Sequence, residues 1–218
     1  MSLEQFHWEL SPRRALSKSV GSGRYGSRLV RSDGDDGRVF AGALVAARRG
    51  DTAGLSVIYR EFQPLLLRYL RARASRLADD LASDTWVAVA QRITTFDGDR
   101  SAFSAWLFTI ARYRLADVRR TSIRRRTETV AEISDSARDE PTEQIALDNL
   151  TAQEVVCLIV RVLNKDQAEV IMLRVLGDLS IAQVAQVMGR DVVWVGVNQH
   201  RALKRLARRF PSKVLALK

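Results

Sequence analysis

The chain has 218 residues, of which 46% are hydrophobic and 7% aromatic, enough to form a core in one large or two small domains. A single cysteine excludes an internal disulfide and a multi-cysteine zinc site, and no stretch approaches the roughly 20 apolar residues of a membrane span. The formal net charge of +10 suits a polyanion, either nucleic acid or an acidic membrane surface.

Residues 1–38 are dominated by Gly, Ser and Arg and show neither a helical nor a strand period. We expect a disordered N-terminal extension there, which is either a regulatory arm or an over-long start. The segment has no apolar core typical of a signal peptide, so we expect the protein in the cytoplasm.

Residues 39–126 are predicted to form one compact domain of four helices. Apolar residues recur at helical spacing, with a break at Gly50-Asp51 and a turn at "DGDR", residues 97–100. Because no alternating Val, Ile and Thr runs indicate a sheet, the fold class is expected to be all-α.

The helix "ADDLASDTWVAVAQRI" separates into two faces. Leu81, Trp86, Val89 and Ile93 lie on or near the face predicted to be buried. The other face carries Asp80, Ser83, Asp84, Val87 and Gln91. An acidic, partly apolar face on a basic protein favours docking on a positively charged protein over contact with DNA, although a plain solvated face is the alternative.

The next helix, "SAFSAWLFTIARYRLADVRRTSIRRR", combines aromatic rings with arginines. The face predicted to be buried carries Phe103, Leu107, Ile110, Ala111 and Val118. The other side offers Phe108, Arg112, Arg119 and Arg120, a set suited to single-stranded nucleic acid because rings stack on bases and guanidinium groups bind phosphate. Trp106 lies beside the apolar stripe and is assigned to core packing or to base contact, with packing favoured.

Residues 127–149 form an acidic segment in a basic chain and are predicted to be a flexible linker. Its carboxylates are Glu128, Glu132, Asp135, Asp139, Glu140, Glu143 and Asp148, opposed by Arg138 alone. A solvated spacer without any further role is an equally acceptable interpretation of this composition.

Residues 150–210 predict a second helical domain that contains a helix-turn-helix, followed by a tail at 211–218. A short helix starts after Ser180, an N-cap residue, and ends at Gly189, which suits a left-handed cap; a second helix follows within about four residues. Cys157 lies in the apolar run "EVVCLIVRVL", so we expect it to be buried rather than redox-active.

The second helix of this motif is predicted to read DNA. Val195, Ala202, Leu203 and Leu206 face the first helix through Val184, Ala185 and Val187, whereas Gln199 is a polar residue on this packing side. The face directed outward carries Trp194, Val197, Asn198, Arg201 and Arg205. Asn pairs with adenine, Arg with guanine, and Val contacts a thymine methyl; Lys204, Arg208 and Arg209 add charge for phosphates.

Together the two blocks resemble the sigma-70 family, in particular the extracytoplasmic-function (ECF) sigma factors of RNA polymerase. "ADDLASDTWVAVAQRITTF" resembles the polymerase-docking helix, and "FSAWLFTIARYRLADVRR" resembles the promoter-melting helix. "LNKDQAEVIMLRVLGDLSIAQVAQVMG" resembles the start of the fourth sigma domain. The last helix departs from the family pattern at Trp194, Gly196, Val197 and Asn198, which puts the promoter sequence it reads in question.

The resemblance implies two helical domains, sigma domain 2 at 39–126 and sigma domain 4 at 150–210, that bind core RNA polymerase and promoter DNA. It places minus-thirty-five recognition on the last helix. It assigns minus-ten recognition and melting to Phe96, Asp97, Arg100, Trp106, Phe108, Arg112, Arg119 and Arg120. The linker would thread the positively charged channel of the polymerase. An anti-sigma factor is a further partner of such proteins, although nothing in this sequence identifies one.

Two other classes of function compete with this interpretation. A helix-turn-helix repressor or activator would bind duplex DNA without docking on polymerase. A nucleic-acid enzyme lacks support, because His7 and His200 are far apart and no clustered carboxylates suggest a metal pair. We therefore expect no catalytic residues, no metal and no cofactor.

Overall fold

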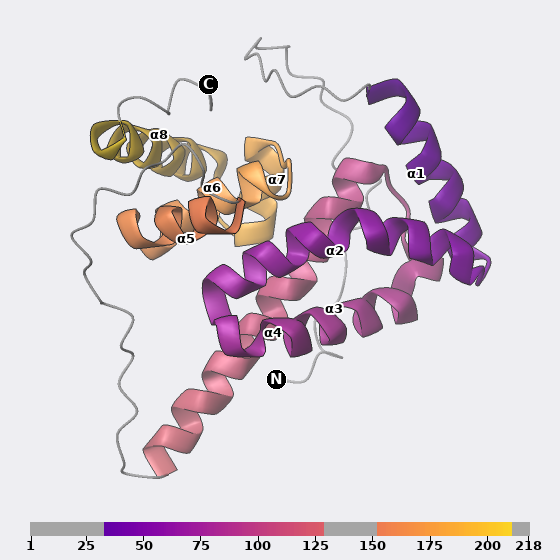
Figure 1. Ribbon diagram of the computed structural model, residues 1–218, viewed down its shortest axis with the longest axis horizontal. Coiled ribbons are helices and arrows are strands. Elements are labelled where there is room, and N and C mark those ends of the chain that lie inside the picture. The colour runs from indigo at the N-terminus through magenta and orange to yellow at the C-terminus, as the bar shows by residue number, and fades with distance from the viewer. Residues whose placement is uncertain (1–32, 129–151, 211–218) are drawn as a thin grey trace.

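The computed structural model describes residues 33–128 and 152–210, and every regular element within these ranges is helical. Helices α1 to α4 form the first half of the chain and α5 to α8 the second (Figure 1). The all-α class expected from the sequence is confirmed. None of the helices in the described ranges is both long and apolar enough to cross a membrane.

The first half consists of four α-helices and two short 3-10 helices. Their bounds are α1 Asp33–Arg48, α2 Thr52–Ala74, η3 Ser75–Leu77, α3 Ala78–Arg92, η4 Ile93–Thr95 and α4 Arg100–Glu128. The break between α1 and α2 falls where the sequence predicted it. Gly50 adopts a left-handed φ of 83°, and the Asp51 carboxylate accepts a 2.8 Å hydrogen bond from the amide of Ala53 to cap α2.

Three phenylalanine rings hold the helices of the first half together. Phe40 of α1, Phe62 of α2 and Phe103 of α4 are buried, and their ring centroids lie 5.1 to 6.1 Å apart in tilted or edge-to-face pairs. Gly54 lets α1 and α2 approach closely, because a Cβ at this position would lie 2.5 Å from the carbonyl oxygen of Ala43. This core fixes which face of α4 is turned towards α1 and α2.

The second half contains the expected helix-turn-helix. The helices of this half are α5 Ala152–Val162, α6 Lys165–Val175, α7 Ile181–Met188 and α8 Val192–Arg209, and the helix-turn-helix consists of α7 and α8. Ser180 and Gln183 form a reciprocal capping box at the start of α7, and Gly189 ends that helix with φ of 62°. The Asp191 carboxylate then caps α8 by accepting a 2.7 Å hydrogen bond from the amide of Trp194. Local signals therefore specify this turn.

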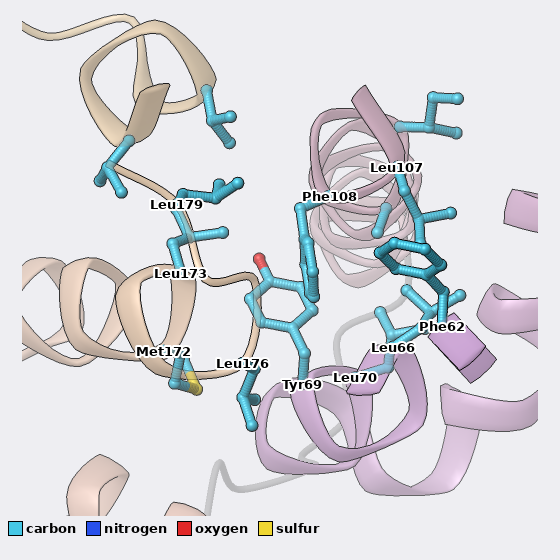
Figure 2. Close-up of a cluster of buried hydrophobic side chains, with 14 of the residues drawn as sticks. Phe62, Leu66, Tyr69, Leu70, Leu107, Phe108, Met172, Leu173, Leu176 and Leu179 are labelled. Atoms are coloured by element: carbon cyan, nitrogen blue, oxygen red, sulfur yellow. The ribbon is translucent and has the colours of Figure 1, made fainter. Parts of the chain in front are cut away.

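The two halves pack against each other, with α2 contacting α5 and α4 contacting α7. Figure 2 shows the apolar part of this contact, in which Tyr69 and Phe108 of the first half lie beside Leu173, Leu176 and Leu179 of the second. All five side chains are buried. The contact therefore covers part of α4.

Two helix ends differ from the expected segment boundaries. Helix α1 begins at Asp33, so residues 33–38, assigned to the disordered extension, are helical. Helix α4 continues to Glu128, two residues into the predicted linker. The rest of those segments, 1–32 and 129–149, lies outside the described residues, as does the tail at 211–218.

Cys157 is exposed, so the prediction of a buried thiol is wrong. The buried face of α5 carries Val156 and Ile159, and Leu163, directly after the helix, is buried on the same side at helical spacing. Cys157 follows Val156 directly and therefore points away from that face.

Candidate nucleic-acid and protein-docking interfaces

One side of α3 is exposed along its whole length and carries the predicted docking residues. Asp80, Ser83, Asp84, Val87 and Gln91 are all exposed. The exposed fraction of Val87 is 53%, high for an apolar side chain, so the face mixes carboxylates with apolar surface. Asp80 lies in the first turn of α3, where a carboxylate also stabilises the positive end of the helix dipole.

The opposite side of α3 is anchored to α2, which fixes how the exposed face is presented. Leu81 and Val89 are buried, as predicted. The indole Nε1 of Trp86 donates a 2.7 Å hydrogen bond to Oε1 of Gln63, and its ring lies 5.0 Å from that of Tyr59. These contacts hold α3 in one rotation about its own axis.

Helix α8 buries the residues expected to pack and exposes a basic face. Val195, Ala202 and Leu206 are buried, Leu203 is half-buried, and Gln199 is a half-buried polar residue on the packing side. The cations of the second part of the helix are all exposed: Arg201, Lys204, Arg205, Arg208 and Arg209. A row of cations of this kind is suited to the phosphates of a duplex.

The outward face at the start of α8 is rotated relative to the prediction. Val197 is exposed, but Trp194 and Asn198 are half-buried at the edge of the face. Val193, which the sequence reasoning left out, has the most exposed side chain there, at 75%. His200 is exposed between Val197 and the cations and was also missed.

Two family models match the chain, one in each half, and together they identify its family. The model Sigma-70 region 2 matches residues 58–127, and Sigma-70, region 4 matches residues 158–206. The ECF RNA polymerase sigma factor BldN of Streptomyces coelicolor is 32% identical over 92% of this chain and 76% of its own length. The chain belongs to the ECF sigma factors of the sigma-70 family.

Other relatives agree with this assignment. The ECF sigma factor ShbA of Streptomyces griseus is 32% identical over 79% of this chain and 96% of its own length. Two solved structures share the fold, each with a TM-score of 0.54. CnrH in complex with the cytosolic domain of CnrY is 20% identical, and the match covers 80% of this chain and 99% of CnrH. RpoE of Bartonella quintana in complex with the anti-sigma factor NepR is 23% identical, and the match covers 72% of this chain and 98% of RpoE. The chain is a polymerase-binding sigma factor, and a helix-turn-helix regulator that acts without polymerase is not supported.

In this ECF sigma factor, Phe96 before α4 and Trp106 within α4 form an aromatic platform. The ring of Phe96 stacks on that of Trp106, with centroids 4.9 Å apart and planes inclined by 24°. Both rings are half-buried, and Phe103 closes the pair from the core side. Trp106 therefore packs against the core, as favoured from the sequence, and keeps part of its surface accessible.

The charged residues of this segment are partly engaged within the first half. Arg100 forms an ion pair with Glu61, and its guanidinium lies 5.4 Å from the centre of the Phe62 ring. The carboxylate of Asp97 lies 3.6 Å from the guanidinium of Arg48, and both side chains are well exposed. Asp97 is thus more accessible to a ligand than Arg100.

Two of the residues predicted to contact nucleic acid on α4 are covered by the second half. Phe108 is fully buried and packs edge-on against Tyr69, so its assignment to an exposed nucleic-acid face is wrong for this arrangement. Arg112 is half-buried, lies 2.9 Å from the carboxylate of Glu169 and donates a hydrogen bond to the carbonyl of Val187. The part of the predicted face that carries Phe108 and Arg112 is therefore an interface between the two halves.

The arginines farther along α4 lie closer to the surface. Arg119 is half-buried and donates a 3.4 Å hydrogen bond to the carbonyl oxygen of Arg73. Arg120 is exposed, with Asp117 at 3.5 Å from its guanidinium. Of the four residues predicted for this side, Arg120 is the most accessible to a nucleic acid.

The carboxylate of Glu169 lies at the centre of the contact between the halves. It is 3% exposed and lies 2.7 Å from the guanidinium of Arg73 and 2.9 Å from that of Arg112. It also accepts a 2.6 Å hydrogen bond from the hydroxyl of Tyr69. Burial, reinforced by the charge of Glu169, raises the pKa of Tyr69 well above its ordinary value of 10.0.

Sequence reasoning missed this cluster. The available signal was a lone carboxylate, Glu169, within the otherwise apolar run "AEVIML", since a buried charge needs a partner of opposite sign. Its partners Tyr69 and Arg73 lie about 100 residues earlier in the chain and carry no local signal. Within the described residues, no group of three or more His, Cys, Asp or Glu side chains could hold a metal ion.

Proposed function

We propose that this ECF sigma factor docks on core RNA polymerase through the exposed face of α3, formed by Asp80, Ser83, Asp84, Val87 and Gln91. The observation that carries the proposal is the combination of two exposed carboxylates with exposed apolar surface on a chain of net charge +10. Such a face repels DNA and is complementary to a basic protein surface. The protein acts in the cytoplasm as an initiation factor and supplies no catalysis of its own.

Helix α8 enters the major groove of the minus-thirty-five element. Val197 in its first turns faces base edges, with Trp194 and Asn198 at the edge of this face, while Arg201 and Arg205 bind bases or flanking phosphates. The rigid turn at Gly189 and the cap at Asp191 support this proposal, because they fix the angle between α7 and α8.

The platform of Phe96 and Trp106 captures an unpaired base of the minus-ten element. Aromatic faces bind bases by stacking, which offsets the few kcal/mol that unpairing and flipping a base cost. Asp97 lies on the loop beside the platform and Arg100 begins α4, and Arg119 and Arg120 bind the backbone of the separated strand.

Promoter melting also requires the contact between the two halves to open. Phe108 and Arg112 reach a DNA strand only when α6 and α7 move away from α4. Arg112 contacts Glu169 and Val187, and the ring of Phe108 lies against Gly177, where an added Cβ would be 3.3 Å from it. The contact is suited to opening, because water compensates the charges of Arg73, Arg112 and Glu169 once they separate. An anti-sigma factor, the class of partner present in the Bartonella quintana RpoE structure, belongs to the proposal as a regulator.

The test is run-off transcription with purified core polymerase and a library of promoter fragments. We expect defined transcripts that depend on this protein and that disappear when Asp80 and Asp84 are both changed to Lys. Asp166→Lys is a matched control for Asp80→Lys, because Asp166 is exposed and lies in the first turn of α6. Both substitutions lose the same favourable interaction with a helix dipole.

Each outcome of this test has a distinct meaning. If transcripts persist after Asp80 and Asp84 are both changed to Lys, the α3 face is not the docking surface, but the role in initiation stands. Transcripts lost equally with Asp166→Lys show a general effect of charge reversal. If no fragment gives protein-dependent initiation while the protein alone shifts duplex DNA, the proposed function is wrong.

A further inference from the structure

The exposed stripe of α8 changes chemistry along its length. Its first turns present Val193 and Val197, 75% and 40% exposed. The following turns present the exposed side chains His200, Arg201, Lys204 and Arg208. These residues share one side of the helix at 3.6 residues per turn, so an apolar end and a basic end form a single continuous surface.

The polar side chains beside the two valines are already engaged. The amide Nδ2 of Asn198 donates a 3.0 Å hydrogen bond to the carbonyl of Trp194, and Asn198 is half-buried. The carboxylate of Asp191 accepts from the amide of Trp194, and the guanidinium of Arg190 lies 5.2 Å from the centre of the Trp194 ring. Hydrogen-bond readout by Asn198 is therefore restricted, and the valines are the most accessible groups at this end.

The charges around the valines identify the occupant of this surface as DNA. Arg190 precedes the helix, and Arg201, Lys204 and Arg208 follow on the same stripe, all exposed. An apolar protein partner would not need this row of cations, whereas a duplex presents phosphates on both sides of a groove that contains apolar thymine methyl groups. The first residues of the second helix of such a motif are those that reach base edges.

We propose that Val193 and Val197 read the C5-methyl groups of thymines in the minus-thirty-five element, so that methyl contact is a determinant of base specificity. This inference rests on the proposed function, because it requires α8 to bind in the major groove. A valine side chain neither donates nor accepts a hydrogen bond, and its match in the major groove is the methyl group that distinguishes thymine from the other bases.

The experiment starts from a promoter library with a randomised minus-thirty-five element, from which the holoenzyme selects the sequences that it binds. Each thymine of a selected element is replaced singly by deoxyuridine, which keeps the pairing with adenine and removes only the methyl group. We expect one or two positions at which holoenzyme binding weakens about fourfold, the ratio that corresponds to about 0.8 kcal/mol for one buried methyl group. Replacement at other thymines should leave binding unchanged.

Single valine substitutions then assign the contact. In Val193→Ala or Val197→Ala, we expect weaker binding to the thymine promoter and loss of the deoxyuridine penalty at the matching position, as in a double-mutant cycle. Val192→Ala is the matched control: Val192 is 52% exposed at the start of the same helix but lies off the stripe, so the penalty should persist.

The outcomes separate this inference from the proposed function. Initiation from a selected element that shows no penalty at any thymine, or penalties that persist in both Val→Ala variants, overturns methyl recognition and leaves the sigma-factor role intact. Failure to select any minus-thirty-five element overturns both. Because the two valines are exposed, their replacement by alanine should not prevent folding, and circular dichroism of each variant verifies this.

Discussion

The hydroxyl of Tyr69 in α2 donates a 2.6 Å hydrogen bond to the carboxylate of Glu169 in α6, joining two residues that are 100 positions apart in the chain. Two guanidinium groups, from Arg73 and Arg112, contact the same carboxylate. One buried side chain therefore links α2, α4 and α6. Removing its charge leaves two partners without compensation, whereas separating the halves allows water to solvate all four groups.

Glu169→Gln should therefore shift the protein towards separated halves. The amide keeps the size of the side chain but loses the negative charge that both arginines face, for an expected loss of about 1–3 kcal/mol at the contact. Energy transfer between dyes on the exposed Cys157 and on an added Ser83→Cys, which is exposed on α3, reports the separation. We expect lower transfer efficiency in Glu169→Gln.

Asp166→Asn is the matched control, since it neutralises an exposed carboxylate on the same helix. Its transfer efficiency should equal that of the unmodified chain. If Glu169→Gln and Asp166→Asn give the same efficiency, the carboxylate of Glu169 does not hold the two halves together.

The raised pKa of Tyr69 predicts a dependence of stability on alkaline pH. Burial, followed by the charge of Glu169, favours the protonated phenol in the folded state. Above about pH 10 the unfolded chain releases this proton while the folded chain keeps it, so the free energy of unfolding falls as pH rises, by up to about 1.4 kcal/mol per pH unit. Tyr69→Phe should remove this part of the slope.

Urea denaturation between about pH 9 and 11 measures that slope. Tyr59→Phe controls for the loss of one tyrosine, because Tyr59 has a 42% exposed side chain on the same helix. Equal slopes for Tyr69→Phe and the unmodified chain would show that Tyr69 does not contribute to the alkaline loss of stability.

Two glycines of the helix-turn-helix should respond to alanine with opposite signs. Gly189 ends α7 at φ of 62°, where a side chain is strained, so Gly189→Ala should destabilise the protein by about 1 kcal/mol. Gly196 lies inside α8 with nothing within 4 Å of an added Cβ, so Gly196→Ala should stabilise it by about 0.5–1 kcal/mol. Thermal denaturation of the two variants gives both values. Shifts of the same sign would contradict this account of the two positions.

The sequence was sufficient for the turn between α7 and α8, where the signal is local. Ser180, Gly189 and the spacing of buried residues on α7 and α8 lie within about 30 residues of one another, and the structure confirms the turn that they predict. The exposed face of α3 was also predicted correctly, because that helix buries one face against a single half of the protein.

The sequence was insufficient where a helix packs on two sides. A periodicity argument assigns one buried face, but α4 contacts the rest of the first half on one side and α7 on the other. Phe108 and Arg112 therefore appeared free, although their partners Tyr69, Glu169 and Val187 lie far away in the chain. For α8, the sequence prediction centred the outward face on Trp194 and Asn198. The most exposed side lies instead opposite the buried residues of the helix, so Val193 was left out.

Arg201→Ala should reduce the salt dependence of promoter binding, whereas Val193→Ala should not. A cation that neutralises a phosphate releases counterions, so losing one such contact lowers the slope of log K against log salt by about 1. A valine that contacts a base contributes affinity without changing this slope. The measurement is holoenzyme binding to one selected promoter over a series of salt concentrations, with Arg161→Ala on the exposed side of α5 as the control. If Arg201→Ala leaves the slope unchanged and weakens binding to the selected promoter but not to other promoters, Arg201 contacts a base edge instead of a phosphate.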